Sequence, residues 1–142
     1  MIIGFSGTSS GATQQQRQTL RYLFNELHLT VLHHGDCIGA DSQAHRIARQ
    51  LFAMIVTHPP TNDSKQARLP ADQTLPARPY LLRNRDIVDA SHGVITCPVG
   101  TVEQFRGSGT WAVIRYARKL RKRLWIIWPD GTFKEENNFE RH

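Results

Sequence analysis

Short apolar runs alternate along this sequence with segments that have the period of an amphipathic helix. The apolar runs predict five strands, over residues 2–6, 29–32, 54–56, 93–97 and 124–128. The segments between and beside them predict four helices, over residues 13–27, 40–51, 80–90 and 108–120. Strands that alternate with helices pair in parallel through right-handed crossovers. We therefore expect an α/β fold, a Rossmann-like three-layer sandwich around a mostly parallel five-stranded sheet.

The length of the chain sets the domain organisation. A domain of 142 residues buries about two-thirds of its unfolded surface and needs no disulfide to hold its core. We expect one domain over residues 1–131, followed by a polar C-terminal tail over residues 132–142. A polar, proline-rich stretch over residues 61–79 has no clear period. Loops this long are typically lids, binding loops or disordered segments.

Composition narrows the class of partner and the compartment. The chain has 18 Lys and Arg against 12 Asp and Glu, a formal charge of +6 that favours anionic partners. Its two cysteines, Cys37 and Cys97, are not arranged as a C-x-x-C pair, which suits a reducing compartment. No apolar run approaches the ~20 residues of a membrane span. These features predict a soluble cytoplasmic protein without membrane contact.

Three glycine-containing turns stand at the starts of predicted helices, over residues 7–11, 35–41 and 107–110. Glycine lets the backbone approach a ligand closely, and the free amides of a helix start attract anions. In parallel sheets such turns meet beyond the carboxyl ends of the strands, where ligands bind. The first turn matches neither the dinucleotide fingerprint nor the P-loop. A plain tight turn therefore stands beside phosphate binding as an alternative.

Other side chains near these turns have both a functional and a structural interpretation. Arg83 offers a planar fork for phosphate, but it also suits a solvated helix face. Asp41 at a helix start either takes part in catalysis or caps free amides and favours the helix dipole. The basic run over residues 115–123 is either a solvated face or a surface for nucleic acid.

A metal site is a further candidate that the sequence disfavours. His33, His34 and His45 stand near Asp36 and Cys37, which are ligand types that zinc accepts. Adjacent residues on a strand point to opposite faces of the sheet, so these side chains do not converge. We expect no metal and no cofactor.

Three motifs together resemble the Rossmann core of the DNA-processing protein A (DprA/Smf) family within the SLOG superfamily. They are Gly39-Ala40-Asp41 with Ala44-His45, Arg83-Asn84-Arg85, and Ser108-Gly109-Thr110, in the family's order. The resemblance implies the strand order 3-2-1-4-5, a phosphate site built from the three turns, and a homo-oligomer. The implied ligand-binding residues are Gly7, Gly35, Gly39, Arg83, Asn84, Gly107, Ser108, Gly109 and Thr110. Thr8, Ser9 and Asp41 join them as candidates from the turns themselves.

The function implied is binding of a nucleotide or nucleotide derivative, as a sensor, sequestering protein or accessory factor. More distantly, the third motif resembles the Lonely Guy phosphoribohydrolases, but Val113 stands where their catalytic glutamate falls. Glu103 is the nearest acid and the candidate catalytic residue for an alternative activity, nucleoside 5′-monophosphate N-glycosidase. A second alternative is a single-stranded DNA-binding module.

Overall fold

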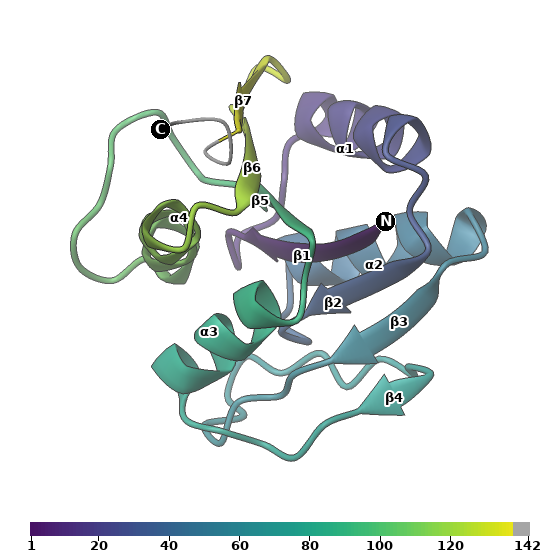
Figure 1. Ribbon diagram of the computed structural model, residues 1–142. Helices are drawn as coiled ribbons and strands as arrows, with labels where there is room; N and C mark the ends of the chain where they lie inside the picture. Colours follow the sequence, from purple (N-terminus) through teal and green to yellow (C-terminus); the bar gives the residue numbers. More distant parts are fainter. Residues whose placement is uncertain (138–142) are drawn as a thin grey trace.

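Residues 1–137, which the computed structural model describes, form a seven-stranded sheet with helices on both faces (Figure 1). Six strands are parallel, in the order β4-β3-β2-β1-β5-β6, and β7 pairs antiparallel with β6. The strands are β1 (Ile2–Gly7), β2 (Val31–His34), β3 (Met54–Thr57), β4 (Gln73–Thr74), β5 (Gly93–Cys97), β6 (Arg123–Ile127) and β7 (Phe133–Glu136).

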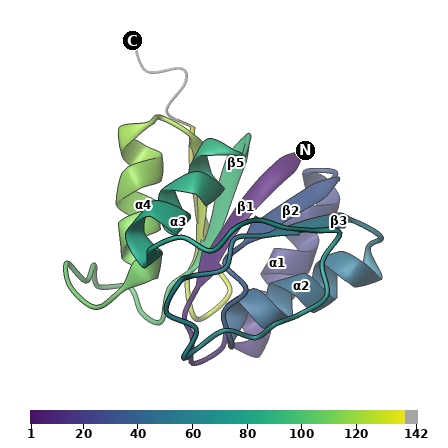
Figure 2. The same cartoon turned by 90° about the horizontal axis from the view of Figure 1, so that it is seen from below.

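Helices cover the two faces of the sheet in pairs, as the view in Figure 2 shows. Helices α1 (Gln14–Glu26) and α2 (Ala40–Gln50) lie on one face, and α3 (Tyr80–Asp89) and α4 (Gly109–Lys119) lie on the other. Phe5 and Phe24 are buried in the layer beneath α1 and α2, whereas Ile114 and Leu124 are buried in the layer beneath α4. The predicted three-layer α/β architecture is confirmed.

The predicted count of five strands is too low by the two edge strands, β4 and β7. The five predicted strands keep their predicted relative order, and β4 and β7 flank them. The two residues of β4 are too few to show a period, and their pairing with β3 depends on the fold of the preceding loop. Strand β7 lies beyond residue 131, in the predicted polar tail. Its residues are mostly exposed, so the sequence gives no apolar signal for a strand, and they form one by pairing with β6. The rest of that tail, residues 138–142, lies outside the described residues.

The long loop between β3 and α3 is fastened to the body of the protein. The buried Asp36 carboxylate accepts hydrogen bonds from the backbone N–H of Arg68 at 3.2 Å, of Leu69 at 3.1 Å, and from Gln66 Nε2 at 3.1 Å. Asp36 itself has a φ of 53°, a left-handed conformation that aspartate tolerates better than most residues. The loop is therefore held against the body of the protein by these hydrogen bonds to Asp36.

The structure bears on the predicted absence of a disulfide and of a membrane-spanning helix. Cys37 and Cys97 are both free thiols. No helix within residues 1–137 is long and apolar enough to cross a bilayer. Cytoplasmic location and homo-oligomerisation stay predictions.

Candidate phosphate-binding site

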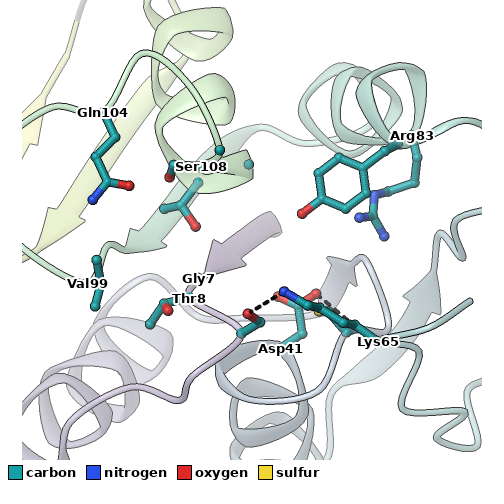
Figure 3. Close-up of a pocket in the computed structure, with 14 residues that line it drawn as sticks. Gly7, Thr8, Asp41, Lys65, Arg83, Val99, Gln104 and Ser108 are labelled. Atoms are coloured by element: carbon teal, nitrogen blue, oxygen red, sulfur yellow. Dashed lines mark hydrogen bonds between the residues drawn. The ribbon is translucent and has the colours of Figure 1, made fainter. Parts of the chain in front are cut away.

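A cavity of about 270 Å³ opens beyond the carboxyl ends of β1 and β5 (Figure 3). The turn after β1 and the start of α4 form one part of its wall, and the start of α3 and the long loop form another. The lining is rich in glycine, hydroxyl and cationic groups: Gly7, Thr8, Ser9, Cys37, Asp41, Lys65, Tyr80, Arg83, Val99, Gln104, Gly107, Ser108, Gly109 and Thr110.

The start of α4 supplies the backbone donors of the cavity. Ser108 is the N-cap, and its hydroxyl accepts a hydrogen bond from Trp111 N at 3.2 Å. The first N–H groups of a helix have no partner within the helix, and they carry the positive end of its dipole. A Cβ built at Gly109 would lie 2.6 Å from the Tyr80 hydroxyl, so glycine allows Tyr80 to pack against the helix start.

Two glycines bring the first turn onto the start of α2. A Cβ at Gly7 would lie 2.5 Å from the Ala40 Cβ, and a Cβ at Gly39 would overlap the Ser9 carbonyl. Gly39 also has a φ of 86°, which side-chain-bearing residues rarely adopt. The Ala40 N–H donates to the Thr8 carbonyl at 3.0 Å. Gly39 therefore shapes the cavity from behind and does not line it.

Arg83 presents a buried cation to the cavity. Its side chain is 3% exposed, and Nη1 donates to the carbonyls of Gly35 at 2.5 Å and His58 at 3.0 Å. The guanidinium carbon lies 4.7 Å from the centre of the Tyr80 ring. Among residues 1–137, no carboxylate lies within 4.0 Å of the Arg83 guanidinium. Asp41 lines the same cavity without forming a direct ion pair with Arg83, so an anion in the cavity would add a stabilising contact for this buried guanidinium.

Asp41 is the carboxyl group that lines the cavity. It accepts hydrogen bonds from the backbone N–H groups of Gly35 and Cys37, both at 3.2 Å. Burial raises the pKa of Asp41 to about 7, against the opposing effects of Arg83 and of these two N–H groups. At neutral pH the group is therefore partly protonated, and it repels a bound anion less than an ionised carboxylate would.

The structure brings most of the predicted ligand-binding residues to one place. Lining the cavity are Gly7, Thr8, Ser9, Asp41, Arg83, Gly107, Ser108, Gly109 and Thr110. Gly35 lies behind the wall, because a Cβ there would overlap Arg83 Nη1. Asn84 accepts from Arg83 Nε at 2.9 Å and lines a separate cleft between α3 and α4.

Glu103, the predicted catalytic residue, does not line the cavity. Its carboxylate pairs with Arg115 of α4 at 3.2 Å, while the neighbouring Gln104 does line it. The sequence gives no direct signal for Lys65, Tyr80 or Val99, which the fold brings to the site together with Cys37 of the second glycine turn. Lys65 comes from the long loop, and its Nζ lies 3.4 Å from the Ser9 hydroxyl (Figure 3).

Four histidines, which lie on β2, on α2 and just after β3, form two pairs. Nε2 of His34 lies 2.9 Å from Nδ1 of His45, and Nδ1 of His33 lies 2.8 Å from Nε2 of His58. Burial lowers the pKa of His34 to about 3 and that of His58 to about 4, so both rings are neutral at pH 7. Within the described part of the chain, no group of three or more His, Cys, Asp or Glu side chains is placed to hold a metal ion.

The fold is shared with proteins of known structure. No protein-family model matches the sequence, and a comparison with curated proteins finds no match. The molybdenum cofactor binding protein of the phototrophic bacterium Rippkaea orientalis has a TM-score of 0.67 and 24% identity, over 88% of this chain and 74% of that one. The molybdenum cofactor carrier protein of Chlamydomonas reinhardtii has a TM-score of 0.60 and 20% identity, with the same coverage.

DNA-processing protein A of Streptococcus pneumoniae has the same architecture. Its TM-score is 0.60 at 16% identity, over 87% of this chain, which spans about half (49%) of that protein. At these identities the likeness establishes the fold. The chain has the Rossmann-like fold of DNA-processing protein A that the resemblance of its three motifs predicts.

Proposed function

We propose that the cavity binds the phosphate of a nucleotide or nucleotide derivative, and that the protein acts as a sensor, sequestering protein or accessory factor. The observation that carries the proposal is the Arg83 guanidinium, which is buried, faces the cavity and has no carboxylate partner among residues 1–137. The start of α4 and the Lys65 ammonium add donors and positive charge to the same cavity.

The names of three structural neighbours refer to ligands that are a small molecule or a nucleic acid. Two neighbours are named for a molybdenum cofactor, and DNA-processing protein A of Helicobacter pylori is named for binding single-stranded DNA. A small molecule or a nucleic acid is thus bound by proteins of this fold. For the present chain we propose a small phosphate-bearing ligand.

A thermal-shift screen of nucleotides, cyclic nucleotides and ADP-ribose derivatives tests the proposal. A ligand at 100 times its Kd adds about 2.7 kcal/mol of stability, or roughly 9 °C in Tm for a domain of this size. Lys65→Ala should reduce the shift, because its ammonium lines the cavity, whereas Arg46→Ala on the outer surface of α2 should not. No stabilisation by any compound would refute the proposal.

Single-stranded DNA binding is the second candidate, and an exposed aromatic favours it. Phe105 is 75% exposed in the loop that precedes α4, and the Arg115 guanidinium lies 5.4 Å from the centre of its ring. Single-stranded nucleic acid typically stacks on such aromatics beside cations. Oligonucleotide binding that weakens steeply with salt and is lost in Phe105→Ala would favour this candidate over a small ligand.

Hydrolysis of an N-glycosidic bond has less support. Its predicted acid, Glu103, pairs with Arg115 away from the cavity lining, and Val113 is buried in α4. The binding proposal predicts no base release from nucleoside monophosphates. Base release that disappears in Glu103→Gln would establish the enzyme instead.

A further inference from the structure

A second chamber adjoins the phosphate cavity. It measures about 260 Å³ and shares four wall residues with the first cavity: Cys37, Lys65, Tyr80 and Arg83. Figure 3 shows Lys65 and Arg83 on the same side of the first cavity, opposite Val99 and Gln104. The remaining wall of the second chamber comes from the long loop, through Pro60, Asn62 and Ser64.

The sizes of the two chambers indicate that they act as one site. Pockets for small ligands typically measure about 300–1,000 Å³, and the phosphate cavity alone is smaller than that. The two adjoining chambers together fall within the range. A ligand whose phosphate lies among Gly7, Ser108 and Arg83 has room for its remaining part past Lys65 and Tyr80.

The walls of the two chambers differ in chemistry. The first is made largely of glycines, hydroxyls and a helix start, whereas Pro60 and the Tyr80 ring contribute flat apolar surface to the second. The loop holds this wall in place, because the Ile38 N–H donates to the Lys65 carbonyl at 2.9 Å and the Thr61 N–H donates to the Arg78 carbonyl at 3.0 Å. A planar ring fits such a surface better than a second phosphate does.

Asn62, an exposed residue of the long loop, lines the second chamber, and its amide can supply a donor there. The Ser64 N–H donates to Asn62 Oδ1 at 3.2 Å, which fixes the oxygen end of the amide toward the backbone. The other end, the Nδ2 amino group, makes no hydrogen bond with any of the residues 1–137. Amide groups of this kind discriminate between a ring carbonyl, which accepts a hydrogen bond, and a ring amino group, which does not.

On the basis of the proposed phosphate site, we propose that the ligand is a phosphorylated heterocycle whose ring occupies the second chamber and presents a carbonyl oxygen to Asn62 Nδ2. Asn62 is then the residue that determines base specificity. The same chamber disfavours a ring with an amino group at that edge, since two donors would face each other.

Calorimetric titration with inosine monophosphate, adenosine monophosphate and orthophosphate tests the proposal. The two nucleotides differ at ring position 6, which is a carbonyl in inosine and an amino group in adenosine, and at the adjacent N1, which carries a hydrogen only in inosine. The wild-type protein should bind inosine monophosphate about three- to tenfold more tightly, the usual effect of one neutral hydrogen bond. In Asn62→Asp the preference should reverse, because the new carboxylate oxygen accepts where Nδ2 donated.

Asn62→Asp preserves the local turn, because its other oxygen still accepts from the Ser64 N–H. The ratio of the two nucleotide affinities within each variant cancels the general effect of the added charge. Asn25→Asp on α1 is the matched control, and its ratio should equal that of the wild type.

Two different results would overturn the inference, and they are distinguishable. Equal affinities for the two nucleotides in the wild type, or a preference that persists in Asn62→Asp, would exclude the role of Asn62. Orthophosphate binding in the same experiment would still support the phosphate site. If neither nucleotide nor orthophosphate bound, the proposed function would fail, and this inference with it.

Discussion

Arg83 and Gly35 illustrate how single residues set the chemistry of this site. The Arg-Asn-Arg motif predicts an arginine at the ligand, and the structure places Arg83 in the cavity wall. The role of Gly35 is not readable from the sequence. Its missing side chain leaves the space that the guanidinium occupies, which is a contact between residues 48 positions apart.

Gly35→Ala tests this packing at the residue scale. The added Cβ would overlap Arg83 Nη1 and come within 2.8 Å of Cζ, which forces the guanidinium out of place. We expect a loss of about 1–3 kcal/mol in the free energy of unfolding and weaker orthophosphate binding. Chemical denaturation and calorimetry measure the two effects.

Gly100→Ala is the matched control for this substitution. A Cβ at Gly100 would meet no atom within 4 Å, so stability and binding should stay at wild-type values. Equal effects of the two substitutions would show that Gly35 has no special role in placing Arg83.

Asp41 makes the affinity of the site depend on pH. Its pKa is raised to about 7, so the carboxyl is largely neutral at pH 6 and ionised at pH 8. Sulfate keeps its charge over this range, and burial lowers the pKa of all four paired histidines, to about 3 for His34 and about 4 for His58. Sulfate affinity should therefore rise about tenfold from pH 8 to pH 6, the scale of one nearby charge.

Asp41→Asn separates this effect from other titrations. The variant keeps an oxygen for the Gly35 and Cys37 N–H groups and loses the charge. Its sulfate affinity should be the same at pH 6 and pH 8. A variant that retained the wild-type pH dependence would assign it to another group.

At the scale of elements, the long loop marks the limit of what the sequence predicts. The βα units and the turns at their ends are predictable, because apolar periodicity and glycine are local signals. The positions of Lys65 and Tyr80 are not, because they depend on contacts between the loop and Asp36 some 30 residues earlier. Strand β4 is missed for the same reason.

Asp36→Ala should loosen the loop and open the second chamber. Removing a buried carboxylate leaves two backbone N–H groups and one side-chain amide without their acceptor. We expect a loss of about 2–4 kcal/mol in stability and faster hydrogen exchange over residues 66–69. Asp63→Ala breaks only an exposed ion pair with Arg68, and it should cost less than about 1 kcal/mol.

For the whole molecule, the neutral histidine pairs couple stability to pH. The folded-state pKa values of His34 and His58 are about 3 and 4, below the ordinary value of 6.5. Their contribution to stability is therefore complete above pH 6.5 and is lost as the pH falls and the unfolded chain binds protons. The raised pKa of Asp41 has the opposite effect on stability, because on acidification the folded protein binds one proton at Asp41 before the unfolded chain does. Burial also lowers the pKa values of His33 and His45, so the histidines outweigh the one carboxyl and acidification gives a net loss of stability.

The free energy of unfolding should fall by at least about 1.4 kcal/mol for each pH unit between pH 6 and pH 4.5, the value for one net proton. His58→Gln removes one of these protons, so the slope should become shallower by about 1.4 kcal/mol per pH unit. Urea denaturation at several pH values measures it. An unchanged slope in the variant would show that His58 is not one of the groups responsible.

The location of the bound phosphate is the decisive test of a phosphate site in this cavity. Orthophosphate titrated into isotope-labelled protein can be followed at each backbone amide by NMR. We expect saturable chemical-shift changes at the backbone amides of residues 7–9 and 108–110, in the turn after β1 and at the start of α4. Shifts absent from those amides, or found instead along the basic surface of α1 and α2, would contradict a phosphate site in this cavity.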